Sequence, residues 1–453
     1  MRVAIVGGGI SGLALAERLA AAGAEPLVLE ADDRAGGKIA TRRKDGFLLE
    51  AGPNGFLDKE PATLELASRI GLRDSLRQAE TAAKRRWVFV RGALREVPST
   101  PPAFLRSDIL PPFAKARVAL EPFSRRAKPG VDESIADFGR RHLGARATRD
   151  LLGAMVLGIF GGDVEKLSLA SCFPKMAELE RAHRSLVLGM IRLQREKKGA
   201  GGPAGPGGVL TSVEGGLGHY PARLAETLGS AVRTGVRVDA LSVTESGVRL
   251  HTNSGGRAAE LDADAVAITA PADVASRLLA PLDPALGELA AGVPYAPMAV
   301  VHLAWPRARI AHPLDGFGFL VPPHEGRGIL GAIFVSSIFP WRAPPDQALF
   351  TVMIGGAVRP ELAARPEAEL ATLAASELGG IIGASGDPSL AEVIRWQRAI
   401  PQYVIGHEAR RREAMERIAR LGPVHLGGNA WRGIGVNDCI AAAAPLATEI
   451  LDR

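Results

Sequence analysis

The sequence predicts a fold of mixed class, α/β in one part of the chain and α+β in another. The first 30 residues contain a short apolar strand pattern, a glycine-rich turn, an amphipathic helix pattern and a second strand pattern. Strand-like alternation returns at 235–243 and 264–272. The segment 80–104 contains charge, a strand pattern and prolines, and from there to about residue 198 the pattern is helical. Alternating strands and helices are typical of a parallel sheet with helices on its faces, whereas separated runs are typical of α+β folds.

Length and composition indicate a globular protein of two or three domains. The chain has 453 residues, 47% of them hydrophobic and 23% charged, which is typical of a protein with large apolar cores. The net charge is +6, so an anionic membrane or an acidic small molecule is a suitable partner. No basic run interleaved with aromatic residues occurs, and we therefore expect no nucleic-acid partner.

Cysteine content and hydropathy indicate a reducing compartment and no membrane-spanning helix. The two cysteines, Cys172 and Cys439, form neither a disulfide framework nor a metal-ligand cluster, and we interpret both as small buried apolar residues. The longest apolar stretch, 151–162, is shorter than the roughly 18 residues of a spanning helix and suits a buried or interfacial helix. The first motif begins at Val3 and leaves no room for a signal peptide, so we expect a cytoplasmic protein.

The N-terminal strand, turn and helix form a dinucleotide-binding motif. VAIV reads as a buried parallel strand, and GGGISG follows it at once. Gly7 permits the tight turn, Gly9 lets the backbone approach a pyrophosphate, and Gly12 allows close packing of helix and strand. The helix N-terminus directs free N–H groups at the phosphates. A Rossmann-like domain is therefore predicted, with cofactor contacts from Gly7, Gly8, Gly9, Ile10, Ser11 and Gly12.

The second strand, PLVLE, ends in the acidic residue that such a motif requires. Glu30 can accept hydrogen bonds from ribose hydroxyls, and its charge disfavours the 2′-phosphate of NADP. The run that begins there, E-x-x-x-R-x-G-G-K, resembles the second signature of FAD-dependent amine-oxidase-like flavoproteins. The resemblance implies non-covalently bound FAD, with the twin glycines near its pyrophosphate and basic side chains offsetting the charge. The residues concerned are Arg34, Gly36, Gly37 and Lys38.

The remaining cofactor contacts implied by this resemblance are scattered along the chain. The turn-rich segment EAGPNGF matches the segment that wraps the flavin ring, and a valine in GVRVDALSV matches a contact on the adenine side. Near the C-terminus a strand, a glycine-rich turn and a helix would lie over the flavin, where a helix N-terminus stabilises negative charge on the reduced ring. The implied contacts are Gly52, Pro53, Asn54, Val238, Trp396, Gly428, Asn429, Gly435, Val436 and Asn437.

The chain has no second GxGxxG motif that follows a strand. A reductase that takes electrons from a pyridine nucleotide usually needs a second nucleotide site. A single FAD site indicates that a substrate reduces the flavin and that O2 reoxidises it. The sequence therefore predicts a flavin-dependent oxidase.

An ordered set of short segments runs along nearly the whole chain: GGGISGL, EADDRAGGK, AGPNGFLD, KRRWVFVRGAL, GIFGGDVEKLS, SCFP, HRSLVLGMI, DGFGFLVP, TVMIGG, IPQY and GVNDCI. In this order the set resembles the oxygen-dependent protoporphyrinogen oxidases. Amine oxidases share the two flavin-binding ends but not the middle segments. The resemblance implies oxidation of protoporphyrinogen IX to protoporphyrin IX in haem biosynthesis, with O2 as electron acceptor and H2O2 as product.

The same resemblance implies an apolar substrate pocket with a cationic end. Arg86 matches an arginine that binds a propionate, and Leu320 and Met353 match positions that sandwich the macrocycle. Gly158 matches a glycine whose carbonyl faces the pyrrole N–H groups. No side chain is identified as a catalytic acid or base, and catalysis would depend on positioning by these four residues. The implied substrate contacts are Arg86, Asn54, Gly158, Gly318, Leu320, Leu330 and Met353.

The resemblance also implies three domains and several partners. Helical patterns that combine apolar faces with Arg and Lys suit an interfacial site, and they imply peripheral attachment to the inner face of the cell membrane. A homodimer and transfer of the product to a ferrochelatase are further implied partnerships. The implied domains are an FAD-binding domain (1–78, 209–270 and 421–453), a substrate-binding domain (271–420, with connecting segments near 79–83 and 199–221) and a helical membrane-associating domain (84–198).

Three other functions stay open from the sequence. A relative that acts on coproporphyrinogen III, which has four propionates rather than two, would be favoured by extra cationic groups around the pocket. An amine or carotenoid-type flavin oxidase would share the flavin-binding ends, but the middle segments argue against it. A non-enzymatic FAD-binding scaffold that delivers a tetrapyrrole would leave the flavin oxidised when substrate is added without air.

Overall fold

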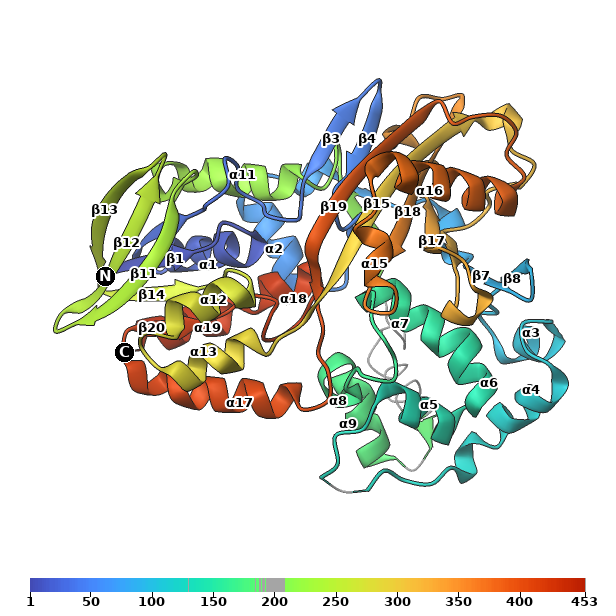
Figure 1. Ribbon diagram of the computed structural model, residues 1–453, viewed down its shortest axis with the longest axis horizontal. Helices are drawn as coiled ribbons and strands as arrows, with labels where there is room; N and C mark the ends of the chain where they lie inside the picture. Colours follow the sequence, from blue (N-terminus) through green and yellow to red (C-terminus); the bar gives the residue numbers. More distant parts are fainter. Residues whose placement is uncertain (129, 184, 187–188, 190–191, 193–207, 453) are drawn as a thin grey trace.

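The computed structural model shows three regions arranged around a common centre (Figure 1). It describes residues 1–128, 130–183, 185, 186, 189, 192 and 208–452. A parallel sheet with its helices lies at one end, a larger mixed sheet at the other, and a group of helices packs below the larger sheet in this view. The mixed α/β class predicted from the sequence is confirmed.

The first sheet is parallel and is assembled from distant parts of the chain. Its strand order is β10-β2-β1-β14-β20, and all four pairings are parallel. Parallel strands buried on both faces read as continuous apolar runs, and in β1 every residue after the first is buried. The bounds are β1 Arg2–Val6, β2 Glu25–Leu29, β10 Val232–Arg233, β14 Ala265–Ile268 and β20 Val424–Leu426.

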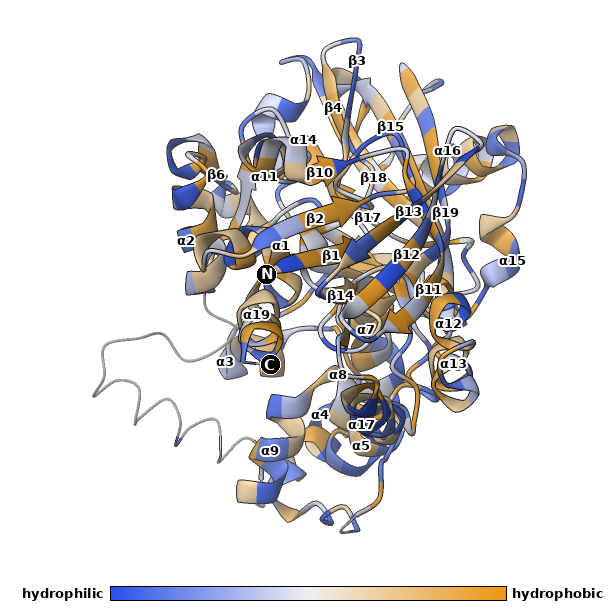
Figure 2. Cartoon of the chain, turned by 90° about the vertical axis from the view of Figure 1, so that its left-hand side faces the viewer, coloured by the Kyte–Doolittle hydropathy of each residue, from blue (hydrophilic) through white to orange (hydrophobic). Residues whose placement is uncertain are grey.

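Helices cover this sheet and complete its core. Helix α1 follows β1 directly, and Gly23, with a positive φ, lies in the turn that leads into β2. The two C-terminal helices pack against α1, while α17 presents a largely hydrophilic surface (Figure 2). The bounds are α1 Ile10–Ala21, α2 Pro61–Arg69, α11 His219–Leu228, α12 Ala272–Leu279, α13 Pro284–Ala291, α17 His407–Ile418, α18 Val436–Ala441 and α19 Ala443–Leu451.

A three-stranded antiparallel sheet is inserted between β10 and β14. It consists of β11 (Arg237–Thr244), β12 (Gly247–Ser254) and β13 (Arg257–Ala263). The turn that the sequence indicates at NSGG is the β12–β13 hairpin, in which the Gly256 N–H donates to Asn253 Oδ1 at 3.0 Å. Strands β12 and β13 were not among the predicted strands, because their exposed faces carry mixed polar residues rather than an apolar run.

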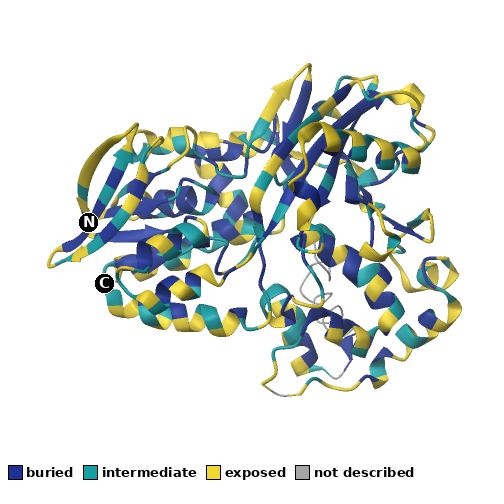
Figure 3. Cartoon of the chain, in the orientation of Figure 1, coloured by how far each residue is buried: buried dark blue, intermediate teal, exposed yellow. Residues whose placement is uncertain are grey.

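The second large sheet has seven strands in the order β19-β15-β18-β17-β16-β7-β8. All pairs are antiparallel except β16 with β7, so the sheet is mixed. Its central strands are buried (Figure 3), and α16 covers one of its faces. The bounds are β7 Trp87–Val90, β8 Ala93–Glu96, β15 Tyr295–Pro306, β16 Gly318–Leu320, β17 Ile329–Phe334, β18 Gln347–Gly355, β19 Leu390–Pro401 and α16 Glu367–Ile382.

The helical region begins only after β8, because residues 87–96, near the start of the span implied as the helical domain, form two strands of the large sheet. The stretch 151–162 forms the end of a π-helical turn and then α7, which has a buried side and an exposed side that carries Met155 and Ile159. No helix in the described parts of the chain combines the length and apolar character needed to cross a bilayer. The bounds are α3 Pro101–Arg106, α4 Pro112–Ala119, α5 Ile135–His142, α6 Ala145–Ala147, α7 Gly153–Phe160, α8 Leu169–Cys172 and α9 Pro174–Ala182.

Short elements connect these regions. Two further sheets are small: β3 pairs with β4, and β9 pairs with β5 and β6. In the sequence, β3 to β6 lie between β2 and β7, and β9 lies between β8 and β10. The bounds are β3 Thr41–Lys44, β4 Phe47–Glu50, β5 Phe56–Leu57, β6 Leu76–Gln78, β9 Leu210–Val213, α14 Val335–Ile338 and α15 Pro360–Ala363.

Candidate active site

A single cavity of about 1680 Å³ lies where the three regions meet. Its wall contains the glycine-rich turn after β1, strands of the seven-stranded sheet and the loop after β20. Helices α7 and α8 close it from the helical region. The cavity is therefore large enough for a dinucleotide and a sizeable second ligand together.

The turn between β1 and α1 leaves open space where a phosphate group would lie. Gly7 has a φ of +109°, and a Cβ on Gly12 would come within 2.0 Å of the Gly7 carbonyl oxygen. By contrast, a Cβ on Gly9 would meet no protein atom within 4 Å, and Gly9 lines the cavity. The residues therefore fit a bound dinucleotide: two glycines shape the turn, and the third keeps space free in front of the N-terminus of α1.

Glu30, at the end of β2, also lines the cavity. Its Oε2 accepts a hydrogen bond from the Gly8 N–H at 2.6 Å, and its Oε1 accepts one from the Asp32 N–H at 2.9 Å. Each carboxylate oxygen keeps a further lone pair. Glu30 thus holds the glycine-rich turn and can still accept bonds from a ribose.

The basic residues of the second motif separate into two roles. Arg34 donates to the Gly37 carbonyl oxygen at 2.7 Å and shapes the twin-glycine turn from outside the main cavity, in whose wall it takes no part. Lys38 lines the cavity beside Gly36 and Gly37. Burial lowers the pKa of Lys38 to about 8. A buried cation at this position suits an anionic cofactor group.

Gly52, Pro53 and Asn54 line the cavity and are held from behind by a buried ion pair. Arg342, in the turn after α14, lies 2.8 Å from Glu50 Oε1 and donates to the Asn54 carbonyl oxygen at 2.9 Å. Both charged side chains are almost fully buried. Burial raises the pKa of the Glu50 carboxyl and lowers the pKa of the Arg342 guanidinium.

The C-terminal wall of the cavity contains Trp396, Asn429, Gly435 and Val436. The Trp396 indole N–H donates to the Ala51 carbonyl oxygen at 2.6 Å and so ties β19 to the loop after β4. Besides Arg34, five predicted cofactor contacts do not line the cavity: Gly8, Gly12, Val238, Gly428 and Asn437. Of these, Val238 on β11 packs in a core that the inserted sheet shares with the first sheet, and the Asn437 side chain donates to the Leu57 carbonyl oxygen at 2.8 Å.

Three of the predicted substrate contacts line the cavity: Asn54 in the loop after β4, Gly158 on α7 and Met353 on β18. Leu320 packs directly against Gly158, since a Cβ there would lie 2.6 Å from Leu320 Cδ2. Leu330 packs in the apolar cluster that includes Met353. Gly318 serves the backbone: its φ is +138°, and a Cβ would lie 2.1 Å from the Ala332 carbonyl oxygen across the β16–β17 pair.

Arg86 does not line the cavity but lies next to it. Its side chain is exposed, and its guanidinium lies 5.9 Å from the ring centroid of Phe317, which does line the cavity. The neighbouring Arg85 is held by Glu96 and Asp315. Arg86 forms no ion pair within the described residues, so its charge is available to an anionic group at the cavity's edge.

Several cavity residues were not predicted from the sequence. His407 stacks on Tyr403 with ring centroids 4.2 Å apart, and burial lowers its pKa to about 4, so it is uncharged at neutral pH. No sequence pattern marks these contacts, because they depend on how α17 meets the loop after β20. Cys172 is only half-buried and lines the cavity, contrary to the prediction of a buried residue.

Five basic residues also line the cavity: Arg126, Lys128, Arg181, Arg411 and Arg432.

Comparison with known proteins identifies the family. Residues 10–451 match the family model described as flavin containing amine oxidoreductase. The chain is 32% identical to the chloroplastic protoporphyrinogen oxidase of Nicotiana tabacum, over 98% of this chain and 84% of that protein. It is 30% identical to the coproporphyrinogen III oxidase of Bacillus subtilis, over 97% and 95% of the two chains.

The fold agrees with these similarities. A crystal structure assigned to a protoporphyrinogen oxidase of Exiguobacterium sp. 255-15 superposes with a TM-score of 0.85 at 26% identity, over 100% of this chain and 99% of the other. The resemblance inferred from the ordered motifs is thereby confirmed. The chain belongs to the flavin-containing amine oxidoreductase family, in the branch that holds the protoporphyrinogen and coproporphyrinogen III oxidases.

Proposed function

We propose that this enzyme binds FAD and oxidises protoporphyrinogen IX to protoporphyrin IX with O2 as acceptor. In each two-electron step the substrate loses a hydride and a proton, and O2 is reduced to H2O2. The observation that carries the proposal is the single cavity that joins a dinucleotide-binding turn to an apolar pocket. The relatives named protoporphyrinogen oxidase, similar over almost the whole chain, support the choice of substrate.

Within this proposal each part of the cavity wall has a task. Bound flavin supplies the ring that accepts the hydride. The turn after β1 and Lys38 bind the pyrophosphate, Glu30 accepts hydrogen bonds from a ribose, and the Asn54 loop fixes the position of the ring. Met353 presents apolar surface to the macrocycle and Leu320 packs behind Gly158, while Arg86 binds one propionate at the edge.

The test is anaerobic addition of protoporphyrinogen IX to the purified flavoprotein, followed by admission of air. We expect bleaching of the flavin absorbance, then recovery of the absorbance with porphyrin fluorescence and H2O2. A Met353→Ser variant should slow bleaching, whereas Val243→Ser, an exposed valine on β11, should not. A flavin that stays oxidised with every porphyrinogen would overturn the proposal and support a non-enzymatic scaffold.

The basic residues on the cavity wall favour a second candidate substrate, coproporphyrinogen III. Its four propionates need more positive charge than the two of protoporphyrinogen, and Arg126, Lys128 and Arg181 lie in the wall in addition to the nearby Arg86. Sequence identity to relatives with either name is about equal. Parallel kcat/KM measurements with the two porphyrinogens decide between them.

We also propose that the enzyme attaches peripherally to an anionic membrane from the cytoplasm. Four large apolar side chains around α3 and α4 are strongly exposed: Leu105, Phe113, Leu120 and Phe123, with 55–77% of their surface accessible. Basic residues lie beside them in the sequence, among them Arg106 and Arg125. Exposed aromatic and aliphatic side chains next to basic ones suit the boundary between lipid headgroups and acyl chains.

A further inference from the structure

The segment between Phe123 and α5 forms part of the cavity wall. Six of its residues line the cavity: Arg126, Ala127, Lys128, Gly130, Val131 and Glu133. The far end of this segment is held by Asp132, which accepts hydrogen bonds from Ser168 Oγ at 2.6 Å and from the Gly406 N–H at 2.8 Å. The segment is thus fixed to the helical region and to the start of α17.

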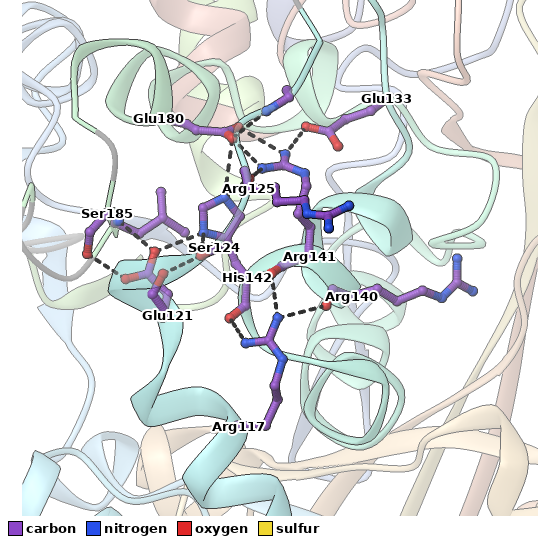
Figure 4. A network of polar contacts seen from close by, with 12 residues as sticks. Arg117, Glu121, Ser124, Arg125, Glu133, Arg140, Arg141, His142, Glu180 and Ser185 are labelled. Carbon is purple, nitrogen blue, oxygen red and sulfur yellow. Dashed lines mark hydrogen bonds and ion pairs between the residues drawn. The ribbon is translucent and has the colours of Figure 1, made fainter.

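The near end is held by a buried clamp of charged side chains (Figure 4). Arg141, on α5, bonds Glu180 Oε1 and Glu133 Oε1 at 2.5 Å each, and its Nη1 donates to the Arg125 carbonyl oxygen at 2.6 Å. Glu180 in turn accepts the Ala127 N–H at 3.2 Å. The clamp therefore fixes the backbone on both sides of Arg126.

His142 extends the clamp inward. It is fully buried, with Nδ1 2.8 Å from Glu121 Oε1 and Nε2 3.3 Å from Glu180 Oε1. Glu180 is therefore surrounded by Arg141, His142 and a backbone N–H. These contacts, led by the hydrogen bond from Arg141, hold the pKa of the Glu180 carboxyl below its ordinary value despite its burial.

Charge on this wall is unbalanced. Both cavity-lining acids of the clamp, Glu133 and Glu180, are bound by Arg141. Arg126, Lys128 and Arg181 form no ion pair within the parts of the chain that the structure describes, although all three line the cavity. All three residues are exposed, and three unpaired cations on this part of the cavity wall create a positive potential that attracts carboxylates.

We propose that Arg126, Lys128 and Arg181 form a second carboxylate-binding subsite, and that Arg141 and Glu180 are positioning residues for it. The proposal rests on the proposed porphyrinogen oxidation and extends it. Arg86 approaches the cavity beside the seven-stranded sheet, whereas these three cations come from the helical region, so the two sites serve propionates on different pyrrole rings. A porphyrinogen with four propionates gains more from the subsite than one with two.

The first test compares the triple variant Arg126→Gln, Lys128→Gln and Arg181→Gln with the matched control Lys175→Gln, an exposed α9 residue outside the cavity wall. In the triple variant we expect the KM for coproporphyrinogen III to rise at least about tenfold, a loss of the size of one charge-assisted hydrogen bond. The KM for protoporphyrinogen IX should rise less and kcat should change little for both. An unchanged KM, or an equal loss in the control, would overturn the subsite.

The positioning role is tested by a double-mutant cycle. Glu180→Gln keeps the shape of the side chain but removes its charge, and should raise the KM for coproporphyrinogen III with little change in kcat. Added to the triple variant, it should raise KM no further, because the groups that it positions are already absent. An additive effect on KM would mean that Glu180 acts independently of the three cations and would overturn the positioning role.

A measurement of porphyrin binding without turnover tests the subsite independently of the proposed reaction. The oxidised porphyrin coproporphyrin III is titrated into the flavoprotein at low and high salt, with quenching of porphyrin fluorescence as the readout. Wild type should bind more tightly at low salt, and the triple variant should show a weaker salt dependence, since Arg86 remains. A wild type that binds in this way but oxidises no porphyrinogen would refute the proposed reaction alone, whereas a triple variant with wild-type binding would refute the subsite.

Discussion

At the scale of single residues, the site depends on buried side chains that hold the cavity wall from behind. Arg342 is the clearest example, because it joins Glu50 to the loop that carries Asn54 and does not line the cavity. No motif in the sequence marks it, since its partners lie almost 300 positions away. The glycines at 7, 9, 36 and 37 were predictable, because a tight turn beside a phosphate requires residues without side chains.

Loss of the Arg342 guanidinium should destabilise the fold. Arg342→Met leaves the Glu50 carboxylate buried and unpaired, which typically costs about 3–5 kcal/mol. We expect that loss in urea unfolding, together with weaker retention of flavin. The double variant Glu50→Gln with Arg342→Met should recover part of the stability, because no buried charge remains. A double variant as unstable as the sum of the two single ones would contradict this account.

Lys38 should make cofactor affinity depend on pH. In the free protein its pKa is lowered to about 8 by burial, and a neighbouring phosphate would raise that pKa. Binding then takes up a proton above pH 8, so the Kd for FAD should be constant below pH 8 and rise by up to about tenfold per pH unit above it. Titration of apoprotein with FAD between pH 7 and 10 measures this, and Lys38→Met should bind more weakly with a flat profile.

At the scale of elements, local pattern predicted the first three well. The run from β1 through α1 to β2 is short, contiguous and fully specified by apolar periodicity and glycine spacing. The sequence shows a strand pattern at β7, but the segment was placed in the helical domain, because the pairing of β7 with β16 joins residues more than 200 positions apart. The same reason hides the wall formed by Arg126 and Lys128, which only the packing of α5 and α9 brings to the cavity.

Two glycines of the first turn should respond differently to the same added methyl group. Gly12→Ala places Cβ 2.0 Å from the Gly7 carbonyl oxygen and should cost about 1–3 kcal/mol of stability. Gly9→Ala meets no protein atom, so the apoprotein should keep its thermal midpoint while its FAD affinity falls at least about tenfold. Calorimetry of apoprotein and flavin titration measure the two effects. Equal FAD affinity in Gly9→Ala and wild type would place the cofactor elsewhere.

At the scale of the whole molecule, the resemblance of the ordered motifs indicated more than any physical pattern did. Composition alone gave a basic globular protein, and it could not show that the three regions share one cavity. The exposed apolar residues around α3 and α4 were easier to anticipate. Amphipathic helical patterns with basic residues are visible in the sequence, and the fold then shows which apolar side chains are exposed.

Removal of two exposed aromatic side chains should weaken membrane attachment without unfolding the protein. Phe113 and Phe123 are 70% and 77% exposed, so changing both to serine should shift stability by less than about 0.5 kcal/mol per site. Cosedimentation with vesicles that contain anionic lipid should fall at least about tenfold, since two apolar side chains no longer leave water. Val243→Ser, at an exposed position on β11, is the control, and equal loss in both variants would argue against this face.

The position of β20 in the sheet affects when this sheet can be completed during synthesis of the chain. The parallel sheet receives its fifth strand from residues 424–426, and α18 and α19 then close over α1. A ribosome synthesises the N-terminal motif long before these segments. Until residues 424–426 have left the ribosome, the parallel sheet therefore lacks its fifth strand and β14 keeps one unpaired edge.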